Sequence, residues 1–226
     1  PHDQTRRQRQ MCIRDRESFD AVGRGEGWHV RIKNPECSTF DIYFDDKLKG
    51  SVNWNLIGEH NKKNAIATFV IAKSLGLKKK QISESLSTFK GTERRMEMIG
   101  KKNSISVYDD FAHHPTAIKY TLDGLRKKVG NQKIVCLLEM RSNTMSSGYH
   151  DKAIPKSLED ADNVFLFSKN QDQIRNIAQK SNKFSTCSGT REFLNLLPKL
   201  NEPNTHSICL SNGSFDQIHH AILERL

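Results

Sequence analysis

From about residue 100 onward, short apolar runs alternate with segments whose apolar residues recur at helical spacing. Short apolar, β-branched runs are typical of buried strands, and apolar residues three and four apart indicate an amphipathic helix. The pattern predicts strands at 105–108, 134–138, 164–167 and 207–210, with a weaker strand near Phe184. It predicts helices between them, near 116–129, 154–161, 171–179, 190–197 and 215–226. Strands that alternate with helices indicate a parallel, doubly wound sheet.

The pattern is different before residue 90. Apolar and polar residues alternate at 28–32 and 40–44, and Asn34-Pro35 and Asp45-Asp46 supply turns. This alternation predicts β-hairpins within residues 19–56. Two helices should follow: one opens at 58–64 and ends at Gly76, and the next carries Ile82, Leu86 and Phe89 on one face.

A charged segment that contains a glycine, residues 90–97, separates the two patterns. We place a domain boundary there, which gives domains at 19–91 and 92–226. Residues 1–18 resemble neither domain, because they hold few apolar residues and are rich in arginine. We interpret them as a disordered or non-native segment; a basic arm that binds nucleic acid is the alternative.

Composition narrows the choice of partner and compartment. The 226 residues suffice for one large or two small domains, and the formal net charge is +10. Such an excess of positive charge favours anionic partners such as nucleotides. The alternative is a basic, solvated surface with no specific anionic partner, which would have the same net charge. The five cysteines form no C-x-x-C pair, and neither a membrane-spanning run nor a signal-peptide pattern is present. We therefore expect a cytoplasmic protein with no membrane partner.

The most informative stretch is 106–118, where an apolar run turns polar and then enters a helix at Pro115. It places two carboxylates and two imidazoles at the strand–helix junction: Asp109, Asp110, His113 and His114. In α/β sheets this edge binds ligands, because helix N-termini there offer free N–H groups to anions. The simpler alternative is a helix cap followed by exposed histidines.

Other polar segments lie at similar positions. Arg141, Ser142, Asn143 and Thr144 follow the strand at 134–138 and offer donors suited to carboxylates. A glycine turn at 211–215 follows the last strand. In the N-terminal domain, His60, Asn61 and Asn64 cluster at a helix start, which is more than one cap requires. Arg94 and Arg95 in the joint are either solvated charges or phosphate ligands.

Some chemistry is excluded by what the sequence lacks. It contains no G-x-x-x-x-G-K-[ST] phosphate loop, no H-x-x-x-H metal pair on a helix and no G-x-S-x-G elbow. We therefore predict no metal site among these 226 residues.

Three motifs in order and spacing resemble the muramyl ligase family, the ATP-dependent amide ligases of peptidoglycan assembly. They are Gly58-Glu-His-Asn-Lys-Lys-Asn64, Gly91-Thr-Glu-Arg-Arg-Met-Glu97 and Asp109-Asp-Phe-Ala-His-His-Pro115. The stretches 138–145 and 210–219 look like those family members that recycle murein peptides. The members that add L-alanine share the third motif.

The resemblance implies a fold class and a set of roles. Residues 19–91 would be the end of a central ATPase domain, and 92–226 a Rossmann-like acceptor-binding domain. The family's phosphate-loop lysine and Mg²⁺ ligands would lie upstream. By motif match, His60, Asn61 and Asn64 would contact the adenosine of ATP, and Arg95 its phosphates. Asp110 and His113 would meet the nucleotide on domain closure, so that Arg95, Asp110 and His113 form the catalytic set. The acceptor would be held by His114 and by Arg141, Ser142, Asn143 and Thr144.

The implied reaction joins UDP-N-acetylmuramate to the tripeptide L-alanyl-γ-D-glutamyl-meso-diaminopimelate at the expense of ATP. The lactyl carboxylate would first become an acyl phosphate, which the amine of the acceptor attacks. Phosphoryl transfer requires positioning and charge neutralisation more than covalent help from the protein. Without a phosphate loop, this chain alone should be an inactive fragment. We expect it to be a monomer. The alternatives are an L-alanine ligase, a non-catalytic nucleotide- or peptide-binding module, and a basic nucleic-acid binder, although no nucleic-acid motif is present.

Overall fold

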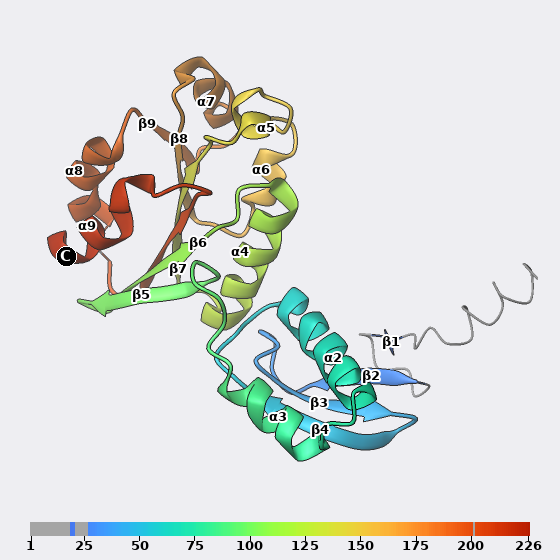
Figure 1. The fold of residues 1–226 in the computed structure, drawn as a ribbon. Helices are drawn as coiled ribbons and strands as arrows, with labels where there is room; N and C mark the ends of the chain where they lie inside the picture. Colours follow the sequence, from blue (N-terminus) through green and yellow to red (C-terminus); the bar gives the residue numbers. More distant parts are fainter. Residues whose placement is uncertain (1–18, 21–26, 201) are drawn as a thin grey trace, which may run out of the picture. The chain divides into compact units, whose positions relative to one another are not determined.

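A computed structural model describes residues 19–20, 27–200 and 202–226. The proposed disordered or non-native segment, 1–18, lies outside these residues. The chain divides into two compact units, Pro1–Lys90 and Gly91–Leu226. The division falls within the charged segment 90–97, and each unit is described below by itself (Figure 1).

The first unit is a four-stranded sheet covered by two helices. Its strands are adjacent in chain order: β1 (Phe19–Asp20), β2 (Trp28–Ile32), β3 (Thr39–Phe44) and β4 (Lys47–Asn53). The pairs β2–β3 and β3–β4 are antiparallel, whereas β1 pairs with β2 in parallel. The helices α2 (Glu59–Ser74) and α3 (Lys79–Thr88) follow, so the hairpins and helices predicted from the sequence are confirmed (Figure 1).

The core of this unit lies between the sheet and the helices. Phe40 and Ile42 from β3 pack with Phe69 from α2, and all three are fully buried. Gly50 in β4 permits this packing, because a Cβ atom there would lie 2.4 Å from Ser83 Oγ and 2.7 Å from the Phe69 ring. The helices can therefore approach the sheet closely only where this strand has no side chain.

The second unit is built on a six-stranded sheet with the order β5-β6-β10-β7-β8-β9. All neighbouring pairs are parallel except β5 with β6. The strands are β5 (Glu97–Lys102), β6 (Ile105–Asp110), β7 (Lys133–Glu139), β8 (Asn163–Phe167), β9 (Phe184–Cys187) and β10 (Thr205–Leu210). The predicted doubly wound, mostly parallel sheet is confirmed.

Helices cover both faces of this sheet (Figure 1). One face packs against α4 (Pro115–Val129), α6 (Ile154–Ser157) and α7 (Gln171–Ala178). The opposite face packs against α8 (Thr190–Leu200), the short 3₁₀ helix η1 (Phe215–Gln217) and α9 (Ile218–Arg225). The short helix α5 (Asn143–Ser146) follows β7. Strands buried on both faces read as continuous apolar runs, which is why 134–138 and 164–167 were recognisable.

The chain order creates a switch point around β10. The chain runs from β6 through β7 and β8 to β9, and then returns to insert β10 between β6 and β7. The connections after β6 and β7 lead to helices on one face, whereas the connection after β10 leads to α9 on the other. Loops that leave to opposite faces open a crevice at the carboxyl ends of the strands, where ligands bind in such folds.

Three details differ from the sequence-based expectation. Strand β5 was not predicted, because its residues are mostly exposed and carry no apolar run. The helix predicted at 154–161 is regular only at Ile154–Ser157. The helix predicted at 215–226 begins at Ile218, because Phe215, Asp216 and Gln217 have φ values of 48°, 49° and 54°. Left-handed backbone is unfavourable for non-glycine residues and cannot continue a right-handed helix.

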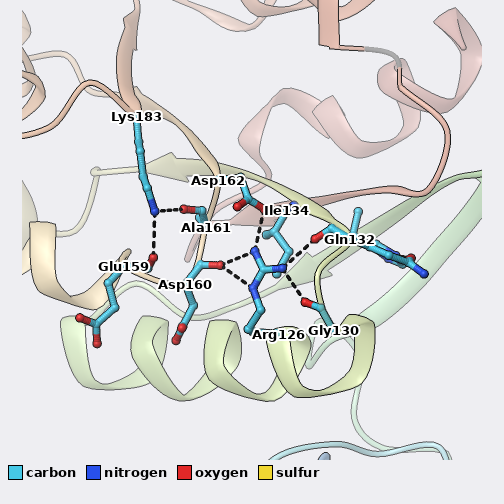
Figure 2. A network of polar contacts seen from close by, with 10 residues as sticks. Arg126, Gly130, Gln132, Ile134, Glu159, Asp160, Ala161, Asp162 and Lys183 are labelled. Atoms are coloured by element: carbon cyan, nitrogen blue, oxygen red, sulfur yellow. Dashed lines mark hydrogen bonds and ion pairs between the residues drawn. The ribbon is translucent and has the colours of Figure 1, made fainter.

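Arg126 ties the end of α4 to the loop before β8 (Figure 2). Its guanidinium donates to the carbonyls of Gly130, Gln132 and Asp160 at 2.7–3.1 Å, and to the Asp162 carboxylate at 2.6 Å. Asp162 also accepts from the backbone N–H of Ile134 at 2.7 Å. One planar side chain thus satisfies carbonyls from two loops.

We expect Arg126→Ala to destabilise the second unit by about 2 kcal/mol, because it removes several charge-assisted hydrogen bonds while leaving the carbonyls within reach of water. Urea unfolding followed by far-ultraviolet circular dichroism will measure this change in the free energy of unfolding. Tryptophan fluorescence would not report on the second unit, because both tryptophans, Trp28 and Trp54, lie in the first unit. The control is Lys127→Ala, which removes an exposed ion pair with Asp123. If Lys127→Ala lowers the free energy of unfolding as much as Arg126→Ala does, the role given to Arg126 is contradicted.

Candidate active site

Arg94 holds together the segments that meet at the switch point. Its Nε donates to Asp109 Oδ2 at 2.7 Å, and its Nη2 donates to the carbonyl of Ser211 at 2.8 Å. Asp109 is the penultimate residue of β6 and is buried, with 4% of its surface exposed. A buried carboxylate requires a charged partner, so Arg94 fixes the joint segment against both β6 and the loop after β10.

Ser211 extends this network to β7. Its hydroxyl donates to Glu139 Oε2 and accepts from the backbone N–H of Gly213 at 2.9 Å. Ser211 is fully buried, and Glu139 is the last residue of β7. The ends of β6, β10 and β7 are therefore joined by one chain of polar contacts beneath the crevice.

Arg141 crosses from the loop after β7 to the loop after β10. A Cβ atom at Gly213 would lie 1.7 Å from Arg141 Nη1 and 2.5 Å from Cζ. The guanidinium therefore rests directly on the Gly213 backbone, and any larger residue there would displace it. Arg141 is exposed and has no ion-pair partner among the described residues, which leaves its charge available for an anion.

Asp110 is occupied within the protein. Its carboxylate accepts from the backbone N–H groups of Met96 and Ala112, both at 2.7 Å, and from Thr121 Oγ1 at 3.4 Å. It thus joins the segment before β5, the end of β6 and helix α4. Its predicted contact with a nucleotide remains a prediction.

Arg95 and His113 both lie beside Phe111. Arg95 is exposed, its Cζ lies 5.7 Å from the centre of the Phe111 ring, and no described residue forms an ion pair with it. His113 Nδ1 lies 2.9 Å from the carbonyl of Phe111, and the His113 ring meets the Phe111 ring edge-on. If Nδ1 carries the proton and donates to this carbonyl, Nε2 is left as an acceptor.

His114 caps helix α4, because its Nδ1 accepts from the backbone N–H of Thr116 at 3.3 Å. Its ring lies 4.4 Å from that of His150, which follows α5. Burial lowers the pKa of His150, the neighbouring imidazole of His114 lowers it further, and Asp151 opposes both effects. The second histidine of the motif therefore has a structural role in the helix cap as well as an exposed ring.

The predicted acceptor loop is anchored on both sides. Ser142 caps α5 by accepting from Met145 N at 3.4 Å, while Asn143 and Thr144 are exposed. Gln173 of α7 donates to the carbonyl of Met145 at 2.7 Å and to Asp151 Oδ1 at 2.7 Å. The loop is therefore fixed from below while its polar side chains remain accessible.

The three residues predicted to contact adenosine belong to the first unit, at the start of α2. Asn61 Nδ2 donates to the carbonyl of Ile57 at 2.8 Å, which uses part of its hydrogen-bonding capacity. Asn64 is exposed, and His60 is partly buried with Nδ1 enclosed. They gather at one helix start, as the sequence indicated, and their role in binding ATP remains a prediction.

A cavity of about 660 Å³ opens beside the Arg94–Asp109 pair. It lies between β5, the loop after β10 and the start of α9, entirely within the second unit. Burial lowers the pKa of His219 in its wall; Asp109 opposes that shift, while His220 and Arg94 reinforce it. Its lining residues are Glu93, Arg94, Glu97, Met98, Ile99, Asp109, Gly213, Ser214, Gln217, His219 and His220.

Across the ranges that the structure describes, no group of three or more histidine, cysteine or acidic residues could hold a metal ion. Within those same ranges, none of the helices combines the length and the apolar character needed to cross a bilayer.

Comparison with known proteins places this geometry in a family. Residues 94–213 match the family model described as "Mur ligase, glutamate ligase domain". The chain is 35% identical over 211 residues to UDP-N-acetylmuramate–L-alanyl-γ-D-glutamyl-meso-2,6-diaminoheptandioate ligase of Escherichia coli, covering 92% of this chain and 46% of that protein. The chain belongs to the Mur ligase family. It spans about half the length of the curated tripeptide ligases that it matches.

Two further Mur ligases bear on its position in the family. A crystal structure of a murein peptide ligase from Psychrobacter arcticus is 30% identical, with a TM-score of 0.64, and covers 92% of this chain and 45% of the other. UDP-N-acetylmuramate–L-alanine ligase of Clostridium botulinum is 37% identical over 138 residues, which covers 61% of this chain and 30% of that protein. The resemblance noted from the three motifs is thus confirmed at the level of the family.

The sequence analysis missed the residues that support the site. From the residues alone it gave Arg94 and Arg95 the same two alternatives, and the family resemblance assigned a role only to Arg95, so the supporting role of Arg94 was missed. Glu139, Ser211 and Gln173 were not singled out at all. The one available signal was position, because Glu139 and Ser211 are polar residues directly at the carboxyl ends of buried strands.

We expect Arg94→Ala to destabilise the second unit by about 2 kcal/mol, because it leaves the buried Asp109 carboxylate without its cationic partner. Arg95→Ala should change the free energy of unfolding by less than about 0.5 kcal/mol, because its side chain is exposed. Urea unfolding of the two variants in parallel will separate these roles. If both variants lose the same free energy of unfolding, the assignment of a supporting role to Arg94 and an accessible position to Arg95 is contradicted.

The second unit should lose stability as the pH falls below about 6.5. Burial lowers the pKa of His219 in the folded state from its ordinary value of 6.5, so the unfolded chain binds more protons in this range. The contribution of His219 to the free energy of unfolding is fully present above pH 6.5. It is lost as the pH falls from 6.5 toward the pKa of His219 in the folded state. Urea unfolding between pH 5 and 8 will show the slope, and His219→Gln should reduce it; an unchanged slope would remove His219 as a cause.

Proposed function

We propose that this chain supplies the acceptor-binding part of an ATP-dependent amide ligase. The full enzyme would join UDP-N-acetylmuramate to L-alanyl-γ-D-glutamyl-meso-diaminopimelate, the reaction named for its Escherichia coli relative. The observation that carries the proposal is the position of Arg141 over Gly213 at the switch point, with its charge open to a carboxylate. Arginine binds carboxylates through paired, charge-assisted hydrogen bonds, and the tripeptide carries three of them.

Three side chains near the carboxyl ends of the strands would have different roles in the reaction. Arg95 is free to neutralise charge on phosphate oxygens, and its contact with Phe111 holds it at the end of β6. His113, oriented by the carbonyl of Phe111, can accept or donate a proton at Nε2. Arg141, with Asn143 and Thr144 on the anchored loop, orients the acceptor so that its amine faces the activated carboxylate.

ATP, when bound, supplies the phosphoryl group that activates the carboxylate of UDP-N-acetylmuramate. The residues of this chain that suit it are the accessible guanidinium of Arg95 and the polar helix start at His60, Asn61 and Asn64. Magnesium ligands are expected from parts of the enzyme outside the described residues. Gly91 at the joint has a φ of 90°, a backbone conformation that suits glycine.

An L-alanine ligase is the second candidate, favoured by the 37% identity to the Clostridium botulinum enzyme. The match to the tripeptide ligase of Escherichia coli, however, runs over 211 residues rather than 138. A larger acceptor also makes better use of a cationic loop and an adjoining cavity than L-alanine does. We therefore favour the tripeptide.

The test is a calorimetric titration of the chain with the tripeptide, with L-alanine as the competing acceptor. We expect the tripeptide to bind and L-alanine not to bind. Arg141→Ala should weaken tripeptide binding about tenfold, the scale of one charge-assisted pair. Arg191→Ala, which removes an exposed arginine on α8, should leave the affinity unchanged.

Two results would contradict the proposal. Equal binding of L-alanine and the tripeptide would favour the second candidate. No binding of the tripeptide would show that the second unit does not hold the acceptor by itself.

A further inference from the structure

We propose that the corner between α2 and α3, residues 71–80, binds the surface of an anionic lipid bilayer. This inference concerns the first unit and does not depend on the proposed function. The sequence analysis expected no membrane partner because the chain contains no membrane-spanning run. A helix corner that lies on the bilayer surface needs no such run.

The corner exposes aliphatic side chains. Ile71 and Leu75 lie four residues apart on one face of α2, and 61% and 77% of their surfaces are exposed. Leu77 in the turn is 41% exposed. Single exposed aliphatic residues are common in proteins and need no explanation, but three of them within one turn form an apolar group that calls for a partner.

The turn has a defined shape and lies at the surface. The backbone N–H of Gly76 donates to the carbonyl of Lys73 at 3.1 Å, and that of Leu77 donates to the carbonyl of Ala72 at 3.2 Å. These bonds close the end of α2. Gly76 has a φ of 89°, and a Cβ atom there would meet nothing within 4 Å. The aliphatic residues are therefore presented by a fixed corner with open space beside it.

Three consecutive lysines follow the aliphatic residues. They are Lys78, Lys79 and Lys80, and all three are exposed. The sequence contains no acidic residue between Glu59 and Glu84. Lys80 lies 3.8 Å from Glu84, whereas Lys78 and Lys79 form no ion pair within the described residues. Most of the positive charge of the corner is therefore available to an external anion.

These lysines do not stabilise α3. They occupy the N-cap and the first turn of the helix, where the helix dipole favours negative charge, and no side chain caps this end. The helix is held instead by Ile82 and Leu86, which are buried in the core of the unit with Phe69. An arrangement that works against local stability is expected where a function requires it.

An anionic bilayer matches both features of the corner. Its headgroups attract lysine, and the boundary between headgroups and acyl chains accepts aliphatic side chains. A nucleic acid would also attract the lysines, but proteins bind its bases with aromatic and arginine side chains rather than with leucine and isoleucine. The combination of lysine and aliphatic residues therefore favours the lipid surface.

The experiment is co-sedimentation of the whole chain with vesicles of phosphatidylcholine, either alone or mixed with phosphatidylglycerol. We expect binding only to the vesicles that contain phosphatidylglycerol, and weaker binding as the salt concentration rises. The combined change Lys78→Gln, Lys79→Gln and Lys80→Gln should weaken binding about 100-fold, because each lysine near an anionic surface contributes about fivefold.

The matched control is the combined change Lys152→Gln, Lys156→Gln and Lys169→Gln, which removes three exposed lysines of the second unit. It lowers the net charge by the same amount and leaves residues 1–18 intact. The affinity for the vesicles should stay within about twofold of that of the wild type, because charges that do not reach the bilayer are screened.

The aliphatic residues are tested separately. Leu75→Ser should weaken vesicle binding about tenfold, the lower end of the factor for burying a leucine side chain. Ile32→Ser changes an exposed isoleucine of β2, outside the corner, and should leave the affinity unchanged.

Folding of the variants is checked by urea unfolding followed by tryptophan fluorescence, since Trp28 and Trp54 are buried in the first unit. The variant without the three corner lysines should unfold at the same or a higher urea concentration than the wild type, because cations are removed from a helix N-terminus. A lower midpoint would give these lysines a structural role and contradict the inference.

Four further results would overturn the inference. Three concern vesicles: equal binding to both kinds, an equal loss in the two triple-lysine variants, or no effect of Leu75→Ser. The fourth is a dimer that forms without vesicles and that Leu75→Ser converts to a monomer, since a second copy would then cover the aliphatic residues. Single-stranded RNA that binds more tightly than the vesicles, with no effect of Leu75→Ser, would assign the corner to nucleic acid instead.

Discussion

The second unit depends on the pairing of Arg94 with the buried carboxylate of Asp109. Asp109 lies at the end of a central strand, where water cannot solvate it, so a cation must be brought to it from another part of the chain. The segment that brings this cation is the joint between the two units, and the same guanidinium reaches the carbonyl of Ser211. A single buried charge thus specifies where the joint, β6 and the loop after β10 must lie.

The candidate site has two layers that follow from this constraint. The lower layer is buried, and its polar side chains are engaged within the protein, which holds the strand ends in place. Asp109 binds Arg94, Asp110 accepts from two backbone N–H groups and Thr121, and Ser211 binds Glu139. The upper layer is exposed and largely unpaired, with Arg95 and Arg141 as its cations. Such an arrangement suits a reaction between anionic groups, because the cations are held in position without being neutralised by the protein itself.

The sequence was sufficient for most of the fold because β6, β7, β8 and β10 are buried on both faces and read as apolar runs. It was insufficient for β5, whose exposed charged residues resemble a loop, and for η1, where a helical spacing hides a left-handed turn. The residue pattern by itself also could not show that Arg94 is engaged inside the protein while Arg95 is exposed. That distinction depends on tertiary contacts, because Arg94 binds Asp109 of β6 and the carbonyl of Ser211, which are distant in the sequence. The cavity could not be predicted either, because its lining residues Glu93 and His219 are far apart in the sequence and are brought together only by the fold.

The place of β10 in the sheet has a consequence for how the chain acquires its structure. This strand is the last of the six in sequence, yet it lies between β6 and β7, which pair with it and not with each other. During synthesis, β7 to β9 can assemble early, but β6 has only its antiparallel neighbour β5 until residues 205–210 emerge. Both sides of the gap then present unpaired strand edges, which are prone to association with other chains. The strand that completes the switch point therefore also ends the period in which the nascent chain needs protection from aggregation.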